Sequence, residues 1–150
     1  MDVIAKTFDE LTTLELYEIL KARAAVFVKE QGISYVDEDN TDFISLHCFY
    51  MEDGLVKGYL RAYPKEKSTD AVCIGRVLTM ERGKGLGTEL MKKSIEIICE
   101  RMQCSKICMD AQKHAVPFYE RLGFKVTSDE YLEEGIIHVD MEMDVADRCH

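Results

Sequence analysis

One segment of the sequence, Ile74 to Met91, restricts the fold more than any other. An apolar run suited to a buried strand leads into a basic, glycine-rich turn, and an amphipathic helix follows. Glycines let backbone N–H groups surround an anion with no Cβ atoms in the way. The helix dipole adds partial positive charge at the same point, and Arg82 and Lys84 add full charges. The segment therefore predicts a pyrophosphate-binding turn between a strand and a helix.

The spacing of the glycines excludes two better-known phosphate motifs. A P-loop requires Gly-Lys-Ser/Thr, whereas Lys84 stands between two glycines. The dinucleotide fingerprint requires G-x-G-x-x-G, whereas Gly83, Gly85 and Gly87 give G-x-G-x-G. An ordinary glycine-rich turn remains the alternative interpretation.

The composition is that of one globular domain over residues 1–150. Hydrophobic residues make up 47% of the chain, which is enough for a substantial core. The formal net charge of −9 argues against nucleic-acid binding, because phosphate contacts need a basic surface. The same charge suits a cationic amine substrate, although it also serves solubility alone.

Six cysteines invite a disulfide interpretation, which their surroundings oppose. Cys48, Cys73 and Cys108 stand in apolar, strand-like runs, where reduced cysteine acts as a small hydrophobe. Asp2 and Lys6 interrupt any apolar start, so no signal peptide is expected. No apolar run has the length that crossing a bilayer requires. We therefore expect a reduced, cytoplasmic protein that does not associate with membranes.

Periodicity predicts three helices. Thr12 and Glu15 form a capping-box pattern, so the first helix is expected from about Thr13 to Glu30. Helical spacing predicts its buried face, formed by Leu16, Leu20, Ala24 and Phe27. A second helix follows the glycine turn and runs to about Arg101, and a third spans Ala115 to Leu122.

Alternating and apolar runs predict about seven strands. They are expected at Val3–Phe8, Phe43–Met51, Leu55–Tyr63, Ala71–Thr79, Lys106–Ala111, Phe124–Thr127 and Ile136–Met143. Asp53-Gly54 marks a hairpin between the second and third strands, and the interval Gln31–Asp42 is expected to be an acidic loop. Hairpins mixed with helical crossovers predict an α/β fold, a mixed sheet with helices on both faces.

The pattern Arg-x-x-Gly-x-Gly, placed after a strand and before a helix, resembles motif A of the GNAT superfamily of N-acetyltransferases. The resemblance implies acetyl-CoA as cosubstrate, with its pyrophosphate bound by Arg82, Gly83, Lys84, Gly85, Leu86, Gly87 and Thr88. It also implies that backbone N–H groups of Val77, Leu78 and Thr79 stabilise the oxyanion and that the pantetheine arm pairs with this strand. The turn before Arg82 is shorter than in the family pattern, which leaves open which N–H faces the thioester.

Residues 112–124, QKHAVPFYERLGF, resemble the second motif of the same superfamily, Asn-x-x-Ala-x-x-Phe-Tyr followed by Gly-Phe. The resemblance implies that Tyr119 is the general acid that protonates the departing thiolate. It also implies that Gln112, which replaces the usual Asn, and Phe118 contact the coenzyme arm. A tyrosine that only packs in the core is the alternative interpretation.

The N-terminal half resembles the ElaA-type members of this superfamily. The pattern R-x-x-V-F-V-x-E-Q begins at Arg23, Y-x-D-x-D-x-x-D begins at Tyr35, and His47 stands on the next predicted strand. The candidates for the base that takes a proton from the amine are Glu30, Asp37 and His47, in no fixed order. The alternatives are a structural Arg–Glu pair, solvated acids and a core histidine.

These features together predict an acetyl-CoA-dependent N-acetyltransferase. The acceptor would be a primary amine of a small molecule or a protein, and the transfer would be direct. A non-catalytic acyl-CoA-binding or protein-interaction module is the alternative, although Tyr119 argues against it. No metal site is expected, because the histidines lack H-x-x-x-H spacing. The sequence leaves the identity of the amine and the oligomeric state open, a homodimer included.

Overall fold

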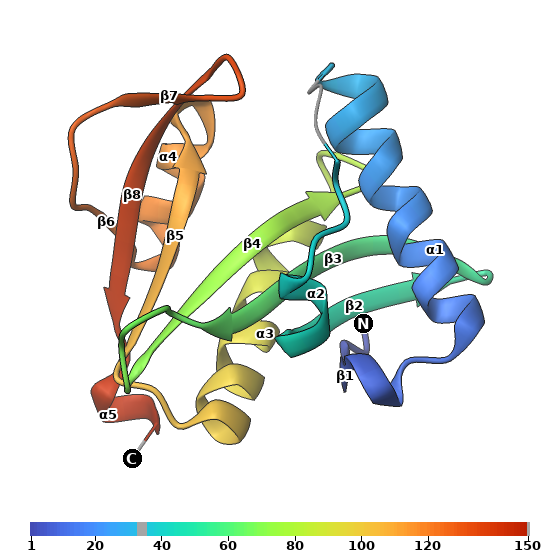
Figure 1. Ribbon diagram of the computed structural model, residues 1–150, viewed down its shortest axis with the longest axis horizontal. Helices are drawn as coiled ribbons and strands as arrows, with labels where there is room; N and C mark the ends of the chain where they lie inside the picture. The colour runs from blue at the N-terminus through green and yellow to red at the C-terminus, as the bar shows by residue number, and fades with distance from the viewer. Residues whose placement is uncertain (33–35, 150) are drawn as a thin grey trace.

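The computed structural model describes residues 1–32 and 36–149, in which eight strands form one mixed sheet (Figure 1). The strand order is β1-β2-β3-β4-β5-β8-β6, and β7 pairs with β8. The strands are β1 (Ile4–Thr7), β2 (Leu46–Glu52), β3 (Leu55–Pro64), β4 (Ala71–Thr79), β5 (Lys106–Gln112), β6 (Lys125–Val126), β7 (Tyr131–Glu133) and β8 (Ile136–Asp144). The α-helices are α1 (Thr13–Arg23), α2 (Thr41–Ile44), α3 (Leu86–Met102), α4 (Val116–Leu122) and α5 (Ala146–Cys149). A π-helix, η2 (Ala24–Glu30), continues α1, and two 3₁₀ turns are η1 (Phe8–Glu10) and η3 (Lys113–Ala115).

The mixed fold with helices on both faces is confirmed, with one strand more than the sequence predicted. The additional strand, β7, is three residues long, and its short charged sequence gives no strand signal. Its hairpin with β8 turns at Glu134 and Gly135, whose φ angles are 50° and 75°. The predicted capping box is also present, because Glu15 N–H donates to Thr12 Oγ1 and Thr12 N–H donates to the Glu15 carboxylate.

The strand expected from Phe43 begins only at Leu46, because residues 41–44 form α2. The helical turn points the Asp42 side chain inward, where it is 5% exposed. Phe43 and Ile44 are left largely exposed. The inward carboxylate, rather than the apolar neighbours, therefore decides the local conformation.

The buried face of the first helix also differs from the expected one. The helix spans the predicted residues 13–30, but its last seven adopt π geometry. Ala24 is exposed, whereas the buried residues include Ile19, Arg23, Val26 and Phe27. A fully buried arginine at the centre of this face explains the error, since only apolar residues were counted in predicting it.

The strands β4 and β5 separate after a short stretch of pairing, which divides the sheet into two arms (Figure 1). Their parallel ladder joins Ala71–Cys73 to Lys106–Cys108 and includes three residue pairs. Beyond it, β4 stays with β3, and β5 stays with β8 as far as Gln112. The α3 crossover allows this parallel pairing, and the divergence leaves one edge of β4 facing an opening.

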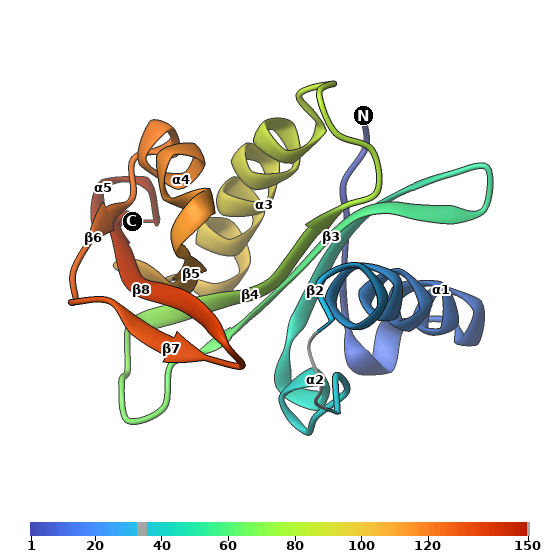
Figure 2. The same cartoon turned by 90° about the horizontal axis from the view of Figure 1, so that it is seen from above.

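Helices cover both faces of the sheet (Figure 2). One face carries α1 and α2, and the core there includes Ile19, Val26 and Phe27. The other face carries α3 and α4 over the larger core, which contains Leu60, Leu90 and Ile95. Among the described residues, no helix is long and apolar enough to span a membrane.

Burial in the large core predicts how much stability a truncated side chain loses. Leu90 of α3 is fully buried, with a methyl group that would lie 3.2 Å from a Cβ placed on Gly58. We expect Leu90→Ala to lower the free energy of unfolding by about 2–5 kcal/mol, because it removes buried methyl groups and leaves a cavity. Leu132→Ala is the control, since Leu132 is 73% exposed and should change stability by less than about 0.5 kcal/mol. Urea unfolding measures both, and equal losses would contradict the prediction.

Candidate active site

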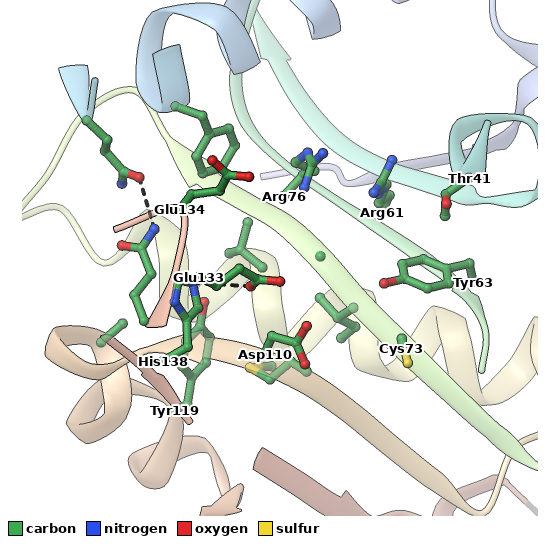
Figure 3. A pocket seen from close by; sticks show the side chains of 18 of the residues that line it. Thr41, Arg61, Tyr63, Cys73, Arg76, Asp110, Tyr119, Glu133, Glu134 and His138 are labelled. Atoms are coloured by element: carbon green, nitrogen blue, oxygen red, sulfur yellow. Dashed lines mark hydrogen bonds and ion pairs between the residues drawn. The ribbon is translucent and has the colours of Figure 1, made fainter. Parts of the chain in front are cut away.

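A cavity of about 540 Å³ lies where β4 and β5 diverge (Figure 3). Its walls come from β3, β4 and β5, from the π-helix η2, from η3 and the middle of α4, from the β7–β8 hairpin, and from Asp39 and Thr41 at the start of α2. Val77, Gln112 and Tyr119, all predicted site residues, line it. Segments that are far apart in the sequence therefore meet at the opening that the divergence creates.

A bulge in β4 shapes the wall of this cavity. β3 and β4 pair at Arg61↔Gly75 and again at Tyr59↔Leu78, so β4 carries one extra residue between these pairs. Arg76 lies at this position with a φ angle of 54°, a left-handed conformation uncommon for a side chain as long as arginine. After the bulge, Leu78 is buried in the core under α1, whereas Val77 faces the cavity.

The glycine turn has the geometry that an anion-binding turn requires. Gly83 and Gly85 have φ angles of 81° and 70°, and a Cβ on either would meet no atom within 4 Å. Gly85 is the N-cap of α3, so the first backbone N–H groups of that helix are directed into this open space. At Gly87 a Cβ would lie 3.4 Å from Phe118 and 3.6 Å from Thr79, which are ordinary van der Waals distances, so this glycine packs closely against both side chains. The residues present therefore fit a pyrophosphate group.

The two cations of the turn already have carboxylate partners. Arg82 bonds to Glu30 at the end of the π-helix, and Lys84 Nζ lies 2.7 Å from a Glu81 oxygen. All four side chains are at least 43% exposed, so water screens these pairs and each adds little stability. An anionic ligand can replace the carboxylates at small cost.

Tyr119 is held in the cavity wall by its aromatic neighbours. Its ring lies edge-on to Phe118 and Phe124, with centroid distances of 5.1 and 6.1 Å. Burial raises the pKa of Tyr119 to about 12, so the hydroxyl keeps its proton at neutral pH. The arrangement provides a positioned proton donor beside the open edge of β4.

A buried ionic network begins at Arg23, whose side chain is fully inaccessible. Its Nε donates to Asp37 at 2.8 Å and its Nη1 donates to Asp42 at 2.7 Å. Burial alone would raise the pKa of Asp42, but the hydrogen bonds and charges of Arg23 and Arg61 outweigh it and lower this pKa. The network attaches α1 to the segment that leads into β2.

Two further arginines extend the network to the cavity wall. Arg61 Nη1 donates to Asp39 at 2.6 Å and to Asp42 at 2.9 Å, and Arg76 Nε lies 3.0 Å from an Asp37 oxygen. Three guanidinium groups therefore face three carboxylates, and their formal charges cancel. The three aspartates of the acidic Gln31–Asp42 segment are therefore paired with arginines within the protein.

Comparisons with known proteins show the family to which this chain belongs. Residues 21–145 match the family model described as Acetyltransferase (GNAT) domain. The chain belongs to the GNAT acetyltransferase family. The expected ElaA-like membership is also confirmed: Protein ElaA of Escherichia coli K12 is 33% identical over 140 residues, 91% of this chain and 92% of that protein.

Other relatives agree over nearly the whole chain. The UPF0039 protein C11D3.02c of Schizosaccharomyces pombe is 36% identical over 149 residues, 97% of this chain and 98% of that protein. The crystal structure of E. coli ElaA superposes with a TM-score of 0.88, covering 95% of this chain and 99% of ElaA. An acyl-CoA N-acyltransferase from Pseudomonas aeruginosa superposes with a TM-score of 0.87 at 33% identity, covering 95% and 99%.

The three candidate bases of this GNAT protein lie outside the lining of the cavity. His47 is fully buried, accepts from Tyr59 Oη at 2.7 Å and donates to the Asp42 carbonyl at 2.9 Å. Burial is the main cause that lowers its pKa, which favours a neutral ring joining β2, β3 and α2. Asp37 belongs to the ionic network, and Glu30 bonds to Arg82. Tyr35, part of the ElaA-type pattern, lies outside the described residues.

The sequence did not single out several residues that face the cavity. Asp110 on β5 lies there with Glu133 and Glu134 of the β7–β8 hairpin (Figure 3). Partial desolvation and the neighbouring carboxylates of Glu133 and Asp140 raise the pKa of Asp110, although its side chain remains exposed to the cavity. An acid inside the apolar run ICMDA was the available signal for Asp110, whereas the hairpin acids gave none.

The ionic network predicts a pH-dependent loss of stability. Asp42→Asn keeps the shape but removes the charge between two buried arginines, so we expect the free energy of unfolding to fall by about 3–5 kcal/mol at pH 7. Because the folded-state pKa of Asp42 is lowered, its contribution is present above the unfolded pKa of about 3.9 and is lost as pH falls through the folded value. The difference between variant and wild type should therefore shrink in acid.

Urea unfolding at pH 7 and at several acidic pH values measures this difference. Asp53→Asn, in the exposed β2–β3 turn, is the control and should leave stability nearly unchanged at every pH. If the free energies of unfolding of Asp42→Asn and wild type differed by the same amount at all pH values, the ionised Asp42 carboxylate would not be the source of the stability.

Proposed function

We propose that this protein transfers an acetyl group from acetyl-CoA to a primary amine by direct attack in a ternary complex. The observation that carries the proposal is the cavity between β4 and β5, where a buried proton donor, Tyr119, faces a strand edge open to a ligand. The glycine turn at the start of α3 adds an anion site beside the same strand. Membership of the GNAT family supports acyl-CoA as the donor.

In this proposal, the glycine turn binds the pyrophosphate. Backbone N–H groups of residues 83–88 and the side chains of Arg82 and Lys84 hold its charge. The open edge of β4 at Val77–Thr79 binds the pantetheine arm and polarises the acyl carbonyl. Gln112, which donates to Gln31 at 2.9 Å, lies at the end of β5 and contacts the arm from the other side.

Two side chains carry protons in the proposed reaction. The amine nitrogen forms a bond to the acyl carbon as the bond from that carbon to sulfur breaks, and Tyr119 gives its proton to the departing sulfur. Asp110 takes the proton that the amine loses, since it lies in the cavity on the rigid strand β5, outside the ionic network, and its raised pKa makes it a stronger proton acceptor than an ordinary aspartate. Asp110, Glu133 and Glu134 give this wall a negative charge, which favours a cationic amine.

Release of coenzyme A tests the proposal directly. A panel of a diamine, an amino sugar, a free amino acid and a lysine peptide is incubated with acetyl-CoA, and free thiol and acetylated amine are both measured. We expect at least one amine to give equal amounts of the two products. Binding of acetyl-CoA with no turnover across the panel and across wider amine collections would indicate an acyl-CoA-binding module.

Gly85→Glu tests the pyrophosphate site. The added carboxylate and Cβ occupy the open space where phosphate would bind, so we expect coenzyme A affinity to fall by at least about tenfold. Gly54→Glu is a matched control, because Gly54 also has a positive φ angle with open space around its Cβ and lies in the β2–β3 turn, outside the glycine turn itself. Calorimetry measures the affinity of both variants for coenzyme A. Equal affinities would mean that the pyrophosphate binds elsewhere.

Tyr119→Phe tests the proton donor. The variant keeps the ring packed and removes the hydroxyl, so single-turnover transfer should slow by about 10²-fold, the lower part of the usual range, because thiolates leave readily. Coenzyme A affinity should stay unchanged, since the loss affects the transition state alone. Tyr17→Phe, at an exposed position of α1, is the control. Full activity in Tyr119→Phe would make this residue a packing residue.

Asp110→Asn tests the proton acceptor through a pH profile. In the wild type, kcat/KM should rise with pH through the pKa of Asp110, because only the ionised carboxylate accepts a proton. The variant should lose this dependence and about 10²-fold or more of its activity. Glu30→Gln is the comparison, since it removes the negative charge that pairs with Arg82 and lies outside the lining of the cavity. If the rise of kcat/KM with pH were lost in Glu30→Gln and kept in Asp110→Asn, Glu30 rather than Asp110 would be the proton acceptor.

A further inference from the structure

Two thiols face each other where β4 and β5 begin to diverge. Cys73 and Cys108 are the last register partners of the parallel ladder, and their Sγ atoms lie 3.2 Å apart. Cys73 lines the cavity and is labelled in Figure 3. Cys108 is 6% exposed, and its thiol also lies 3.6 Å from the Val72 carbonyl. A small oxidant in the cavity therefore has access to one sulfur, and the second lies in contact with the first.

The backbone geometry of this pair suits a covalent bridge. Register partners on neighbouring strands are about 4.8 Å apart, within the span of about 4.4–6.8 Å between Cα atoms that a disulfide allows. The two sulfurs are already on the same side of the sheet, and a bond requires them to approach by about 1 Å more. Because the ladder ends at these residues, the strands beyond them can adjust without breaking further pairs.

We propose that Cys73 and Cys108 form a reversible dithiol site that hydroperoxides oxidise to a disulfide. The first sulfur attacks the peroxide, whose O–O bond breaks to release an alcohol and leave a sulfenic acid. The second sulfur displaces that oxygen as water and forms the S–S bond. In total, two thiols lose two electrons and two protons, and one hydroperoxide becomes one alcohol and one water. A small dithiol reverses the reaction by exchange.

The surroundings separate this pair from Cys48, Cys99 and Cys104. The hydrogen bond that the Cys73 thiol donates lowers the pKa of Cys108 against the effect of burial, and Lys65 adds to this lowering, while Asp110 and Glu142 oppose it. The same hydrogen bond raises the pKa of Cys73, so Cys108 is the more nucleophilic sulfur of the pair. Burial raises the pKa of Cys48 to about 12, so that thiol is a poor nucleophile. Cys99 and Cys104 are buried below 4% exposure. Oxidation should therefore select Cys73 and Cys108, and the site does not depend on the proposed acetyl transfer.

Peptide mapping of the wild-type protein tests the proposal without any substitution. The protein is treated with tert-butyl hydroperoxide, the remaining thiols are blocked with iodoacetamide after unfolding, and trypsin digestion is carried out without reduction. Trypsin gives the peptides 68–76 and 107–113, which each contain one cysteine. We expect these two peptides joined, with a loss of two hydrogen masses that dithiothreitol restores. The peptides with the other cysteines should carry the blocking group.

Two variants and a melting curve complete the experiment. Cys73→Ser and Cys108→Ser should each abolish the cross-link. In the wild type, oxidation should raise the melting temperature by several degrees, because the bridge closes a long loop of the unfolded chain. Neither variant should show this increase. Oxidation of Cys73 to sulfinic acid, a bond between two protein molecules, or no reaction at peroxide levels that oxidise exposed methionines would each overturn the proposal.

Discussion

The short pairing between β4 and β5 is the constraint on which the site depends. Three residue pairs hold these parallel strands together, after which each follows its antiparallel neighbour. If the ladder continued to Thr79, the backbone groups of β4 would be used within the sheet, and Tyr119 would face a closed wall. The bulge at Arg76 and the α3 crossover both act at this strand. Fold and site are therefore consequences of the same separation.

Electrostatics divides the cavity into two unlike walls. On the β3–β4 side, Arg61 and Arg76 are balanced by the aspartates that follow the π-helix. On the β5–β8 side, Asp110 and the hairpin glutamates add negative charge close to Tyr119. The first wall is rigid, because opening it would expose buried ion pairs to incomplete solvation. The second wall carries the net negative charge and is therefore the better suited of the two to recognising a cation.

The sequence predicted the features whose signals are local. The glycine turn, the capping box at Thr12 and the tyrosine motif each depend on a few adjacent residues, and the strands other than β7 have clear periodicity. The cavity wall could not be predicted in this way, because Arg61 and Asp110 belong to different elements that meet only in the folded sheet. His47 is ambiguous in sequence, and only its contacts with Tyr59 and the Asp42 carbonyl show that its ring connects elements. The prediction of the buried face of α1 failed for a related reason, since a charged residue, Arg23, occupies the centre of that face.

The end of the π-helix links the two arms of the sheet through consecutive residues. Glu30 bonds to Arg82, beyond the end of β4, while Gln31 accepts from Gln112, at the end of β5. A ligand that binds Arg82 has to compete with Glu30. Its observed affinity equals its affinity for the unpaired Arg82 multiplied by the fraction of molecules in which the Glu30–Arg82 pair is broken. By reciprocity, a molecule with ligand bound at Arg82 has lost the contact that joins Glu30, at the end of the π-helix, to Arg82. Ligand occupancy at the glycine turn and the Glu30–Arg82 contact would then be thermodynamically coupled, and the coupling would be small because the pair is exposed.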